Sequence, residues 1–276
     1  MSHFTVLVIS DEDQNPEDQL APFQEDCGDE DFDKDLLEFD TEVEPDEFQA
    51  KAREIVDDQT DEKVKDKYTE MLGCGKYKEI IIDYNGYEED ENGNLGYYSN
   101  PDAHWDWYEL GGRWTGMLKV KDGIKPLLGG RGWRSVADKI KKNHCDQALV
   151  KDIDFEGMLK DEVKDAKKLY DKAITILEEE IKKGQPLDKA RVEANWKTGV
   201  DLCQYKSKVD YVEMVRSNGF YTHAFITPDG EWIEKAGMGW FGCTSNEKPD
   251  EYRRQWDEMI KNLKPEQTLS VYDCHI

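Results

Sequence analysis

The stretch His104–Val120 reads HWDWYELGGRWTGMLKV and places three tryptophans within ten residues. Large aromatic side chains dominate core and interface energetics, so a cluster this dense requires either a core or a partner. Two strand-like runs meet at residues 110–113, where a glycine pair permits a tight turn or the close approach of another backbone. We therefore predict a β-hairpin here, in which Trp105, Trp107 and Trp114 cover a hydrophobic core.

The same stretch carries charged side chains that suit a recognition or catalytic corner. His104, Asp106, Glu109 and Arg113 lie close together in the sequence. No known catalytic motif has this spelling, so the residues by themselves name no reaction. An ion pair between Asp106 and Arg113 across the hairpin explains them equally well, and both interpretations stay open at this point.

Strand-like runs occur near both ends of the chain. Residues 4–9 read FTVLVI and residues 268–276 read TLSVYDCHI. Short apolar runs rich in β-branched residues are typical of central strands. We expect these two strands to pair in one sheet, which would tie down both ends. Further strands are expected near residues 79–84, 105–109, 114–120, 220–227 and 231–234.

Most of the expected strands are separated by hairpin turns and only a few by helices. This pattern predicts an α+β fold with a mostly antiparallel sheet that contains both terminal strands. We expect a single domain over residues 1–276. Its core sheet comes from residues 1–10, 76–130 and 219–276, an acidic segment with a helix spans 11–75, and a helical arm or insertion spans 150–217.

Apolar side chains recur at three- and four-residue steps from Ile153 to Lys183, the spacing of one face of an α-helix. Gly184 and Pro186 end this helix. About 30 helical residues reach ~45 Å, which is longer than one small sheet requires. We expect the excess to form an arm or to pair with residues 187–196, and to support self-association into a homo-oligomer.

The net charge of −25 is concentrated in the first quarter of the chain. Residues 1–70 hold 25 acidic and 6 basic side chains, whereas residues 71–276 hold 37 acidic and 31 basic ones. Such a field repels nucleic acid and anionic membranes and draws in basic partners. We therefore expect a protein partner, without direct contact to nucleic acid or a membrane. The residues expected to bind that partner are Asp29, Glu30, Asp31, Asp33, Asp35, Trp105, Arg113 and Trp240.

The cysteines and histidines predict neither a metal site nor a bound cofactor. No two of the six cysteines form a Cys-x-x-Cys pair, and no histidine pair has the spacing of metal ligands. The acidic run at residues 29–35 lacks the glycine and the terminal glutamate of an EF-hand loop. No apolar run approaches the ~20 residues of a membrane span. Free thiols in a reducing cytoplasm are expected.

Cys274 and His275 are a second candidate for chemistry. Pairing of the terminal strands would bring His3 beside His275 and make a small polar cluster with Asp273 and Cys274. A Cys-His nucleophile pair is conceivable there. Adjacent residues of a strand point to opposite faces, however, so Cys274 and His275 do not form a site by themselves.

Several motifs together resemble a family of proteins from tailed phages and prophages. They are MSHFTVLV at residues 1–8, WDWY at 105–108 with GGRW at 111–114, MGW at 238–240 and VYDCHI at 271–276. The family has no assigned reaction, so the resemblance implies no catalytic residue. It implies a phage protein that acts in the host bacterial cytoplasm. A further similarity is to the phage proteins that inhibit the Gabija defence nuclease.

Two functions follow as expectations. The resemblance, the acidity and the lack of a catalytic motif favour a phage inhibitor that binds a host anti-phage defence protein and covers a basic nucleic-acid-binding surface of a nuclease complex. The alternative is a small cytoplasmic phage enzyme, a hydrolase or nucleotide-modifying protein, with its site near the Trp105–Trp114 hairpin or at Cys274 and His275. A perturbed cluster in a deep pocket would favour the enzyme, and a shallow acidic face the inhibitor.

Overall fold

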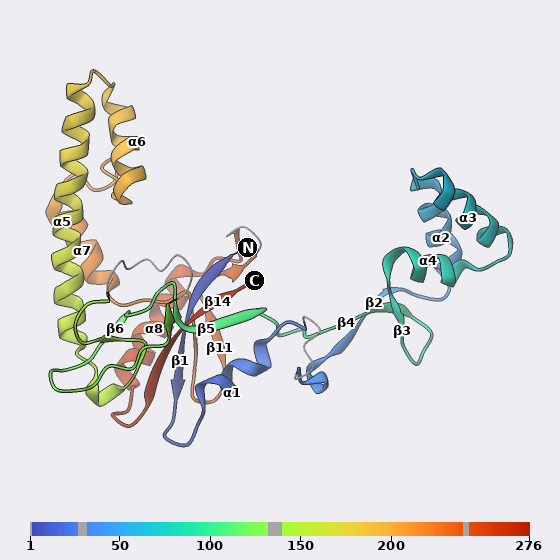
Figure 1. Ribbon diagram of the computed structural model, residues 1–276, viewed down its shortest axis with the longest axis horizontal. Helices are drawn as coiled ribbons and strands as arrows, with labels where there is room; N and C mark the ends of the chain where they lie inside the picture. Colours follow the sequence, from blue (N-terminus) through green and yellow to red (C-terminus); the bar gives the residue numbers. More distant parts are fainter. Residues whose placement is uncertain (1, 27–31, 132–139, 240–242) are drawn as a thin grey trace. The chain divides into compact units, whose positions relative to one another are not determined.

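The computed structural model describes residues 2–26, 32–131, 140–239 and 243–276. The structure is α+β, with a mixed, mostly antiparallel main sheet and a long helix (Figure 1). We expected one domain, but contacts within the chain divide it into two compact units. The sheet unit consists of Met1–Leu20 and Trp107–Ile276, and the acidic unit, Ala21–Asp106, is inserted between these two segments.

The main sheet is organised around the strands from the two ends of the chain. β1 and β14 are antiparallel neighbours from His3 opposite His275 to Ser10 opposite Thr268, so the expected pairing of the terminal strands is confirmed. From edge to edge the sheet contains β11 (Trp232–Glu234), β10 (Ala224–Ile226), β1 (His3–Ser10), β14 (Thr268–His275), β5 (Trp107–Gly112) and β7 (Gly130–Arg131), and β9 (Gln147–Leu149) also pairs with β14.

The apolar run of β1 forms the centre of the main core. All residues of this strand except the first are buried. Leu7 and Ile9 belong to one cluster with Val271 of β14 and Trp256 of α8 (Pro249–Asn262). The sheet unit also contains α1 (Pro16–Leu20), which packs on β1, β6 (Leu118–Lys119) paired with β8 (His144–Cys145), β12 (Gly237–Met238) paired with β13 (Thr244–Ser245), and the 3₁₀ turn η3 (Val150–Asp152).

A helical arm of three helices belongs to the sheet unit (Figure 1). It has its own cluster, which contains Tyr170 and Ala173 of the first helix, Ala194 of the second and Val212 of the third. The long first helix and its pairing with the second confirm the sequence prediction. Among the described residues, none of the helices combines the length and apolar character that crossing a membrane requires. The arm consists of α5 (Phe155–Lys182), α6 (Leu187–Thr198) and α7 (Lys208–Asn218).

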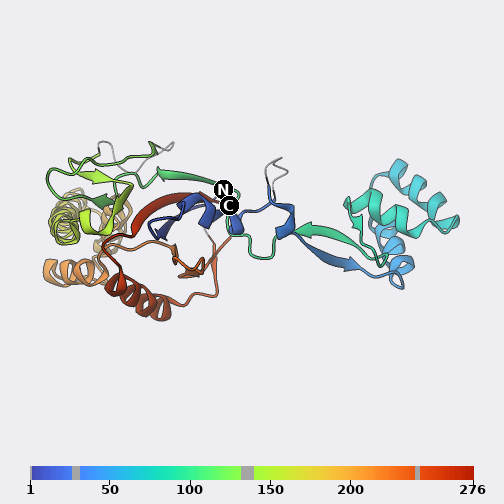
Figure 2. The ribbon, with the colours of Figure 1, turned by 90° about the horizontal axis from the view of Figure 1, so that it is seen from below.

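The acidic unit has a sheet and a core of its own. Two of its strands run side by side as a ribbon, and three helices gather at one end of it (Figures 1 and 2). Ile80, Ile81 and Leu95 are fully buried in the core of this unit. Its elements are η1 (Ala21–Phe23), η2 (Lys34–Leu36), β2 (Glu38–Val43), α2 (Phe48–Asp58), α3 (Glu62–Gly73), α4 (Tyr77–Asn85), β3 (Glu88–Glu89) and β4 (Leu95–Ser99), with the strands in the order β2-β4-β3.

The strand expected at residues 79–84 is wrong, because this segment lies within the helix α4. The helix buries Ile80 and Ile81, and it ends at Gly86 in the left-handed conformation, with a φ of 74°. Adjacent β-branched residues favour a strand, but a short apolar run does not distinguish a strand from a helix that buries one face. Contacts with α2 and α3 decide the outcome in favour of the helix.

The hairpin expected at residues 105–120 is also wrong. β5 pairs with β14 on one side and with β7 on the other, and the short strand β6 that follows pairs with β8. The tryptophans therefore do not share one core. Trp107 is 47% exposed on β5, whereas Trp105 is 2% exposed within the acidic unit and Trp114 is half-buried.

The substitution Trp256→Ala tests the main core. The Trp256 ring is buried against Phe220, Phe225 and Tyr252. We expect its loss to lower the free energy of unfolding by ~3–5 kcal/mol, through lost burial and the cavity that remains. Trp107→Ala is the control, because nearly half of that side chain lies in solvent, and it should cost no more than ~1 kcal/mol. Urea unfolding followed by circular dichroism measures both, and equal losses would contradict this placement of the core.

Candidate functional site

The corner Gly111–Arg113 is built around two buried carboxylates. Gly111 and Gly112 have φ angles of 79° and 50°, in the left-handed region that favours glycine. A Cβ atom on Gly111 would collide with the carboxylate of Asp146, and one on Gly112 would collide with the side chain of Asp273. The sequence requires this glycine pair because two acidic side chains press against the backbone, and not because a hairpin turns here.

Asp146 is fully buried, and the chain supplies donors to both of its carboxylate oxygens. The Thr115 hydroxyl and the Gly129 N–H each donate to Oδ2 at 2.9 Å, and the Gly116 N–H donates to Oδ1. The backbone carbonyl of Asp146 also accepts from the Val271 N–H of β14, at 2.9 Å. A buried carboxylate satisfied in this way fastens the surrounding loops to the sheet.

Asp273 is the second buried carboxylate, and it confirms the polar cluster expected where the terminal strands meet. Its Oδ1 lies 2.8 Å from His3 Nδ1, and its Oδ2 accepts from the Arg113 N–H at 2.9 Å. The His3 ring meets the rings of His275 and Trp107 edge-on, with centroids 4.9 and 6.2 Å away. Histidine, carboxylate and a half-exposed tryptophan therefore share one end of the sheet.

Glu109 is the titratable group of this corner with a shifted pKa. It lies opposite Asp273 in the register of β5 with β14, and its carboxyl packs on Gly130. Burial raises the pKa of Glu109, and the charges of Asp273 and Asp146 raise it further. A carboxyl with a raised pKa beside a His-Asp pair has the parts of acid-base chemistry. Within the part of the chain that the structure describes, no group of three or more His, Cys, Asp or Glu side chains could hold a metal ion.

Cys274 does not join His275 in a nucleophilic pair. His275 meets the His3 ring, whereas Cys274 points to the opposite face of β14 and is fully buried. Burial raises the pKa of the Cys274 thiol well above its usual range, and the neighbouring charge of Asp273 raises it further. Because the thiolate is the attacking form of cysteine, this environment is the opposite of what a nucleophile requires.

The acidic residues expected to bind a partner are only partly within the described chain. Asp33 and Asp35 are both exposed in the acidic unit. The Asp33 carboxylate caps η2 by accepting from the Asp35 N–H at 3.1 Å, so part of its role is local. The others, Asp29, Glu30 and Asp31, and also Trp240, lie outside the described residues.

The prediction that Trp105 binds a partner is wrong for the acidic unit as it stands, because this side chain is buried. The Trp105 carbonyl accepts from the Glu25 N–H at 2.7 Å, which fixes the residue inside the unit. Arg113 is partly buried, and its backbone N–H is used by Asp273. Its exposed part is small, and we assign it to the corner that holds the sheet unit together.

An acidic pocket of about 500 Å³ lies between β2 and α2 of the acidic unit. Lys51 is the one basic residue among those that line it, and a hydrogen bond from Lys51 Nζ to Glu54, at 3.0 Å, raises the pKa of this lysine. Four carboxylates against one ammonium leave the pocket negative, so a cation fits it. The lining residues are Glu42, Val43, Asp46, Glu47, Ala50, Lys51, Glu54 and Tyr87.

The ribbon of β2 and β4 exposes aromatic rings between carboxylates. Tyr97 lies opposite Asp40, and Tyr98 lies opposite Phe39, whose ring it meets edge-to-face at 4.9 Å. Both tyrosines are exposed, and the charges of Glu42 and Asp40 raise the pKa of Tyr97. Tyrosine is enriched at protein interfaces. Sequence analysis missed this surface, although acidic and aromatic residues alternate in its first strand.

The acidic unit carries most of the negative charge of the protein. Ala21–Asp106 contains 28 acidic and 8 basic residues, a balance of −20. The sheet unit contains 34 acidic and 29 basic residues, a balance of −5. The charge therefore follows the division of the structure into units more closely than it follows position in the sequence.

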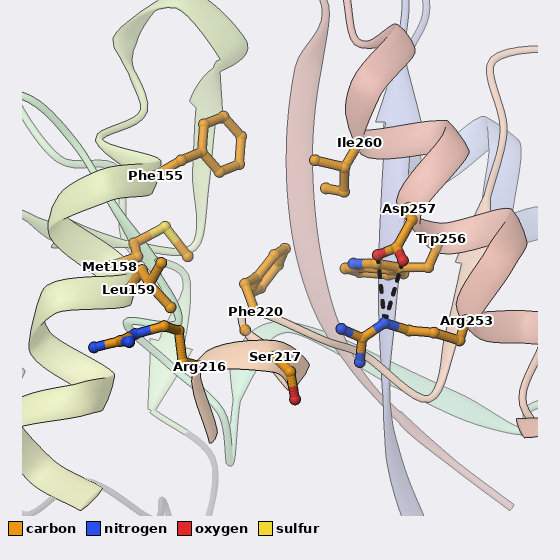
Figure 3. Close-up of a pocket in the computed structure, with 11 residues that line it drawn as sticks. Phe155, Met158, Leu159, Arg216, Ser217, Phe220, Arg253, Trp256, Asp257 and Ile260 are labelled. Carbon is orange, nitrogen blue, oxygen red and sulfur yellow. Dashed lines mark hydrogen bonds and ion pairs between the residues drawn. The ribbon is translucent and has the colours of Figure 1, made fainter. Parts of the chain in front are cut away.

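A second pocket, of about 240 Å³, lies in the sheet unit between α5, α8 and the end of α7 (Figure 3). Phe155 and Met158 of α5 face Phe220 and Trp256 across it. The two arginines at its edge are already paired within the chain: Arg216 Nη1 lies 2.6 Å from Glu213, and Arg253 Nε lies 3.3 Å from Asp257. The pocket suits a small apolar group and offers no reactive side chain.

Comparison of the chain with models of protein families, with curated proteins and with solved structures gives no match. The functional argument therefore rests on the geometry and charge of the molecule itself.

The substitution Gly111→Ala tests the role of the glycine pair. We expect it to cost more than ~3 kcal/mol of unfolding free energy, because a positive φ strains alanine and the new Cβ displaces the Asp146 carboxylate from its donors. Gly123→Ala is the matched control, since Gly123 has a φ of 89° but no atom within 4 Å of the position of its Cβ. It should cost only the ~1–2 kcal/mol of backbone strain. Chemical denaturation that ranks the two variants equally would refute the proposed contact.

Proposed function

We propose that this protein is a phage-encoded inhibitor that binds a host anti-phage defence protein in the bacterial cytoplasm and catalyses no reaction of its own. The observation that carries the proposal is the charge balance of −20 held by one compact unit, Ala21–Asp106. Proteins that bind nucleic acid present clustered lysines and arginines to the phosphates. An acidic unit of this kind competes for such a surface on a nuclease complex.

The acidic pocket and the β2–β4 ribbon supply the contacts in this proposal. A lysine or arginine of the partner enters the pocket, where Glu42, Glu47 and Glu54 surround its charge and Tyr87 offers a ring face. Tyr97 and Tyr98 add aromatic area beside the pocket, with few rotatable bonds to immobilise. The charge then sets the rate of encounter, and the tyrosines and the pocket set the lifetime of the complex.

The alternative is a small phage enzyme that acts near Trp105–Trp114 or at Cys274 and His275. The raised pKa of Glu109 beside His3 and Asp273 is the observation that favours it. The buried thiol argues against nucleophilic attack, and donors within the chain occupy Asp146 and Asp273. These facts support binding as the function of the molecule.

The test neutralises four carboxylates of the acidic pocket together, as Glu42→Gln, Asp46→Asn, Glu47→Gln and Glu54→Gln. The resemblance to Gabija inhibitors makes that nuclease the first target. We expect the variant to associate with it at least ~10-fold more slowly at low salt, while dissociation changes less, because long-range charge governs encounter. The difference should shrink as salt is raised, since the Debye length is only ~8 Å at 0.15 M salt. Stopped-flow or surface-based kinetics measure both rates.

The control neutralises four exposed carboxylates of the sheet unit, as Glu178→Gln, Asp229→Asn, Glu231→Gln and Glu258→Gln. It changes the net charge equally and should leave association and phage rescue nearly intact. A third variant neutralises Asp29, Glu30, Asp31, Asp33 and Asp35, the segment that the sequence singled out. Equal slowing by the pocket and control variants would refute a binding surface on the acidic unit. A folded Glu109→Gln or His3→Gln variant that still binds but no longer protects phage would replace the inhibitor by the enzyme.

Self-association remains a prediction, and the helical arm offers a surface for it. Trp196 is 86% exposed on α6, and Val192 lies one turn before it and is also exposed. An exposed aromatic with an aliphatic neighbour on one helix face suits an interface. We expect Trp196→Glu to shift sedimentation of the purified protein toward the monomer, whereas Lys189→Glu on the same helix should not. A wild-type protein that sediments as a monomer at high concentration contradicts this expectation.

A further inference from the structure

A third pocket, of about 340 Å³, lies between the helices α5 and α7 and the residues around β8. One wall of the pocket is apolar and the other is polar. The apolar wall consists of Met117, Met158, Ala166, Leu169, Tyr211 and Val215. The polar wall consists of Lys141, His144, Asp161, Glu162 and Asp165.

His144 presents a ring nitrogen to this pocket without a hydrogen-bond partner. The side chain belongs to a residue that is only 9% exposed, and its Nδ1 lies 2.6 Å from the Gly116 carbonyl oxygen. Because a carbonyl accepts, Nδ1 carries the proton, and Nε2 of the neutral ring is then an acceptor. Within the described chain no hydrogen-bond partner reaches this buried Nε2. The Asp161 Oδ2 atom is 3.7 Å away and is already bound by Lys119 Nζ at 2.7 Å.

Glu162 presents a second buried atom without a partner. Its Oε2 is inaccessible to solvent and has no hydrogen-bond donor among the described residues. Burial raises the pKa of Glu162, which Lys141 lowers only in part. The other two carboxylates of the pocket are both paired: Asp161 with Lys119, and Asp165 with Lys141 at 2.6 Å. One carboxylate of the three therefore lacks a cation.

The two unpartnered atoms both require a donor. A buried acceptor without a hydrogen bond costs free energy, and native structures leave few of them. A ligand that satisfies Nε2 of His144 and Oε2 of Glu162 together must carry several N–H groups, and a positive charge would balance the carboxylate. A metal ion fits less well, because Lys119 already occupies Asp161 and metal sites recruit three or more ligands.

We propose that this pocket binds a small organic cation, a primary ammonium on an apolar stem. The ammonium donates to Glu162 and to His144 Nε2, and the stem lies against Met158, Leu169 and Val215. A cavity of ~150 Å³ accepts a benzene ring, so the volume here is sufficient for a ring or a six-carbon chain with its amine. The site lies in the sheet unit and is independent of the inhibitor function proposed for the acidic unit.

The experiment titrates the full-length protein with hexylamine and benzylamine by calorimetry, and compares hexan-1-ol, benzyl alcohol and hexanoate at equal concentrations. Saturable binding of the amines, at least ~10-fold tighter than of the alcohols, is the expected result, because a hydrogen bond to a charged group is worth about this factor or more. Hexanoate should not bind. Equal affinity for amine and alcohol, or no saturable binding of either amine, would overturn the proposal.

Two variants locate the site. Glu162→Gln should weaken amine binding at least ~10-fold and leave the affinity for the alcohol unchanged. It removes a buried charge that lacks a partner, so it is expected to fold as well as the wild type. Leu169→Phe fills the apolar end and should weaken amine and alcohol alike. Glu156→Gln, an exposed change on the same helix, is the control. Amine binding that survives both Glu162→Gln and Leu169→Phe would place the ligand elsewhere and refute the assignment.

Discussion

The pairing of β1 with β14 is the constraint on which the sheet unit depends. Its register sets which side chains share a face of the main sheet. At one end it brings Leu7 opposite Val271 in the apolar core, and at the other it brings His3 opposite His275 in the polar cluster. A slip of one residue would exchange the two faces, placing the buried Cys274 with the histidines. The core and the Gly111–Arg113 corner are therefore two consequences of one register.

The two units of the protein handle negative charge in opposite ways. In the sheet unit, Asp146 and Asp273 are buried, and each is stabilised by backbone and side-chain donors at fixed positions. In the acidic unit most carboxylates lie in solvent, where each costs little and their repulsion acts on the unit as a whole. The first arrangement gives structural specificity. The second gives a long-range field, and a partner feels it before contact.

Local patterns predicted the elements whose signals agree with their tertiary contacts. The terminal strands, α5 with its partner α6 and the β10–β11 hairpin follow from apolar runs, helical spacing and turn residues. The α4 helix did not follow, because its isoleucine run suits a strand equally well until α2 and α3 cover it. The Gly111-Gly112 pair was read as a turn because nothing local shows that Asp146 and Asp273 will press against it.

The candidate sites were less predictable than the fold. Asp146 carries no sequence signal, and the pocket beside α5 joins His144 to Glu162 from separate segments. The acidity of the first part of the chain was visible in the composition, but its limits were not. They follow the boundary of a folded unit at Asp106, which only long-range contacts define. Long-range contacts also explain why Trp105 and Trp107, two residues apart, have opposite environments.

The insertion of the acidic unit between α1 and β5 has a consequence for the order of events on the ribosome. β1 is synthesised long before β14, its longest partner in the sheet, so it waits unpaired while most of the chain is made. The contacts of the acidic unit close over a much shorter length of chain, and local contacts form early. A folded, strongly charged neighbour would then sit directly behind an exposed apolar strand, where its repulsion keeps nascent chains apart. The charge that meets a partner in the finished protein would thus first act as protection against aggregation.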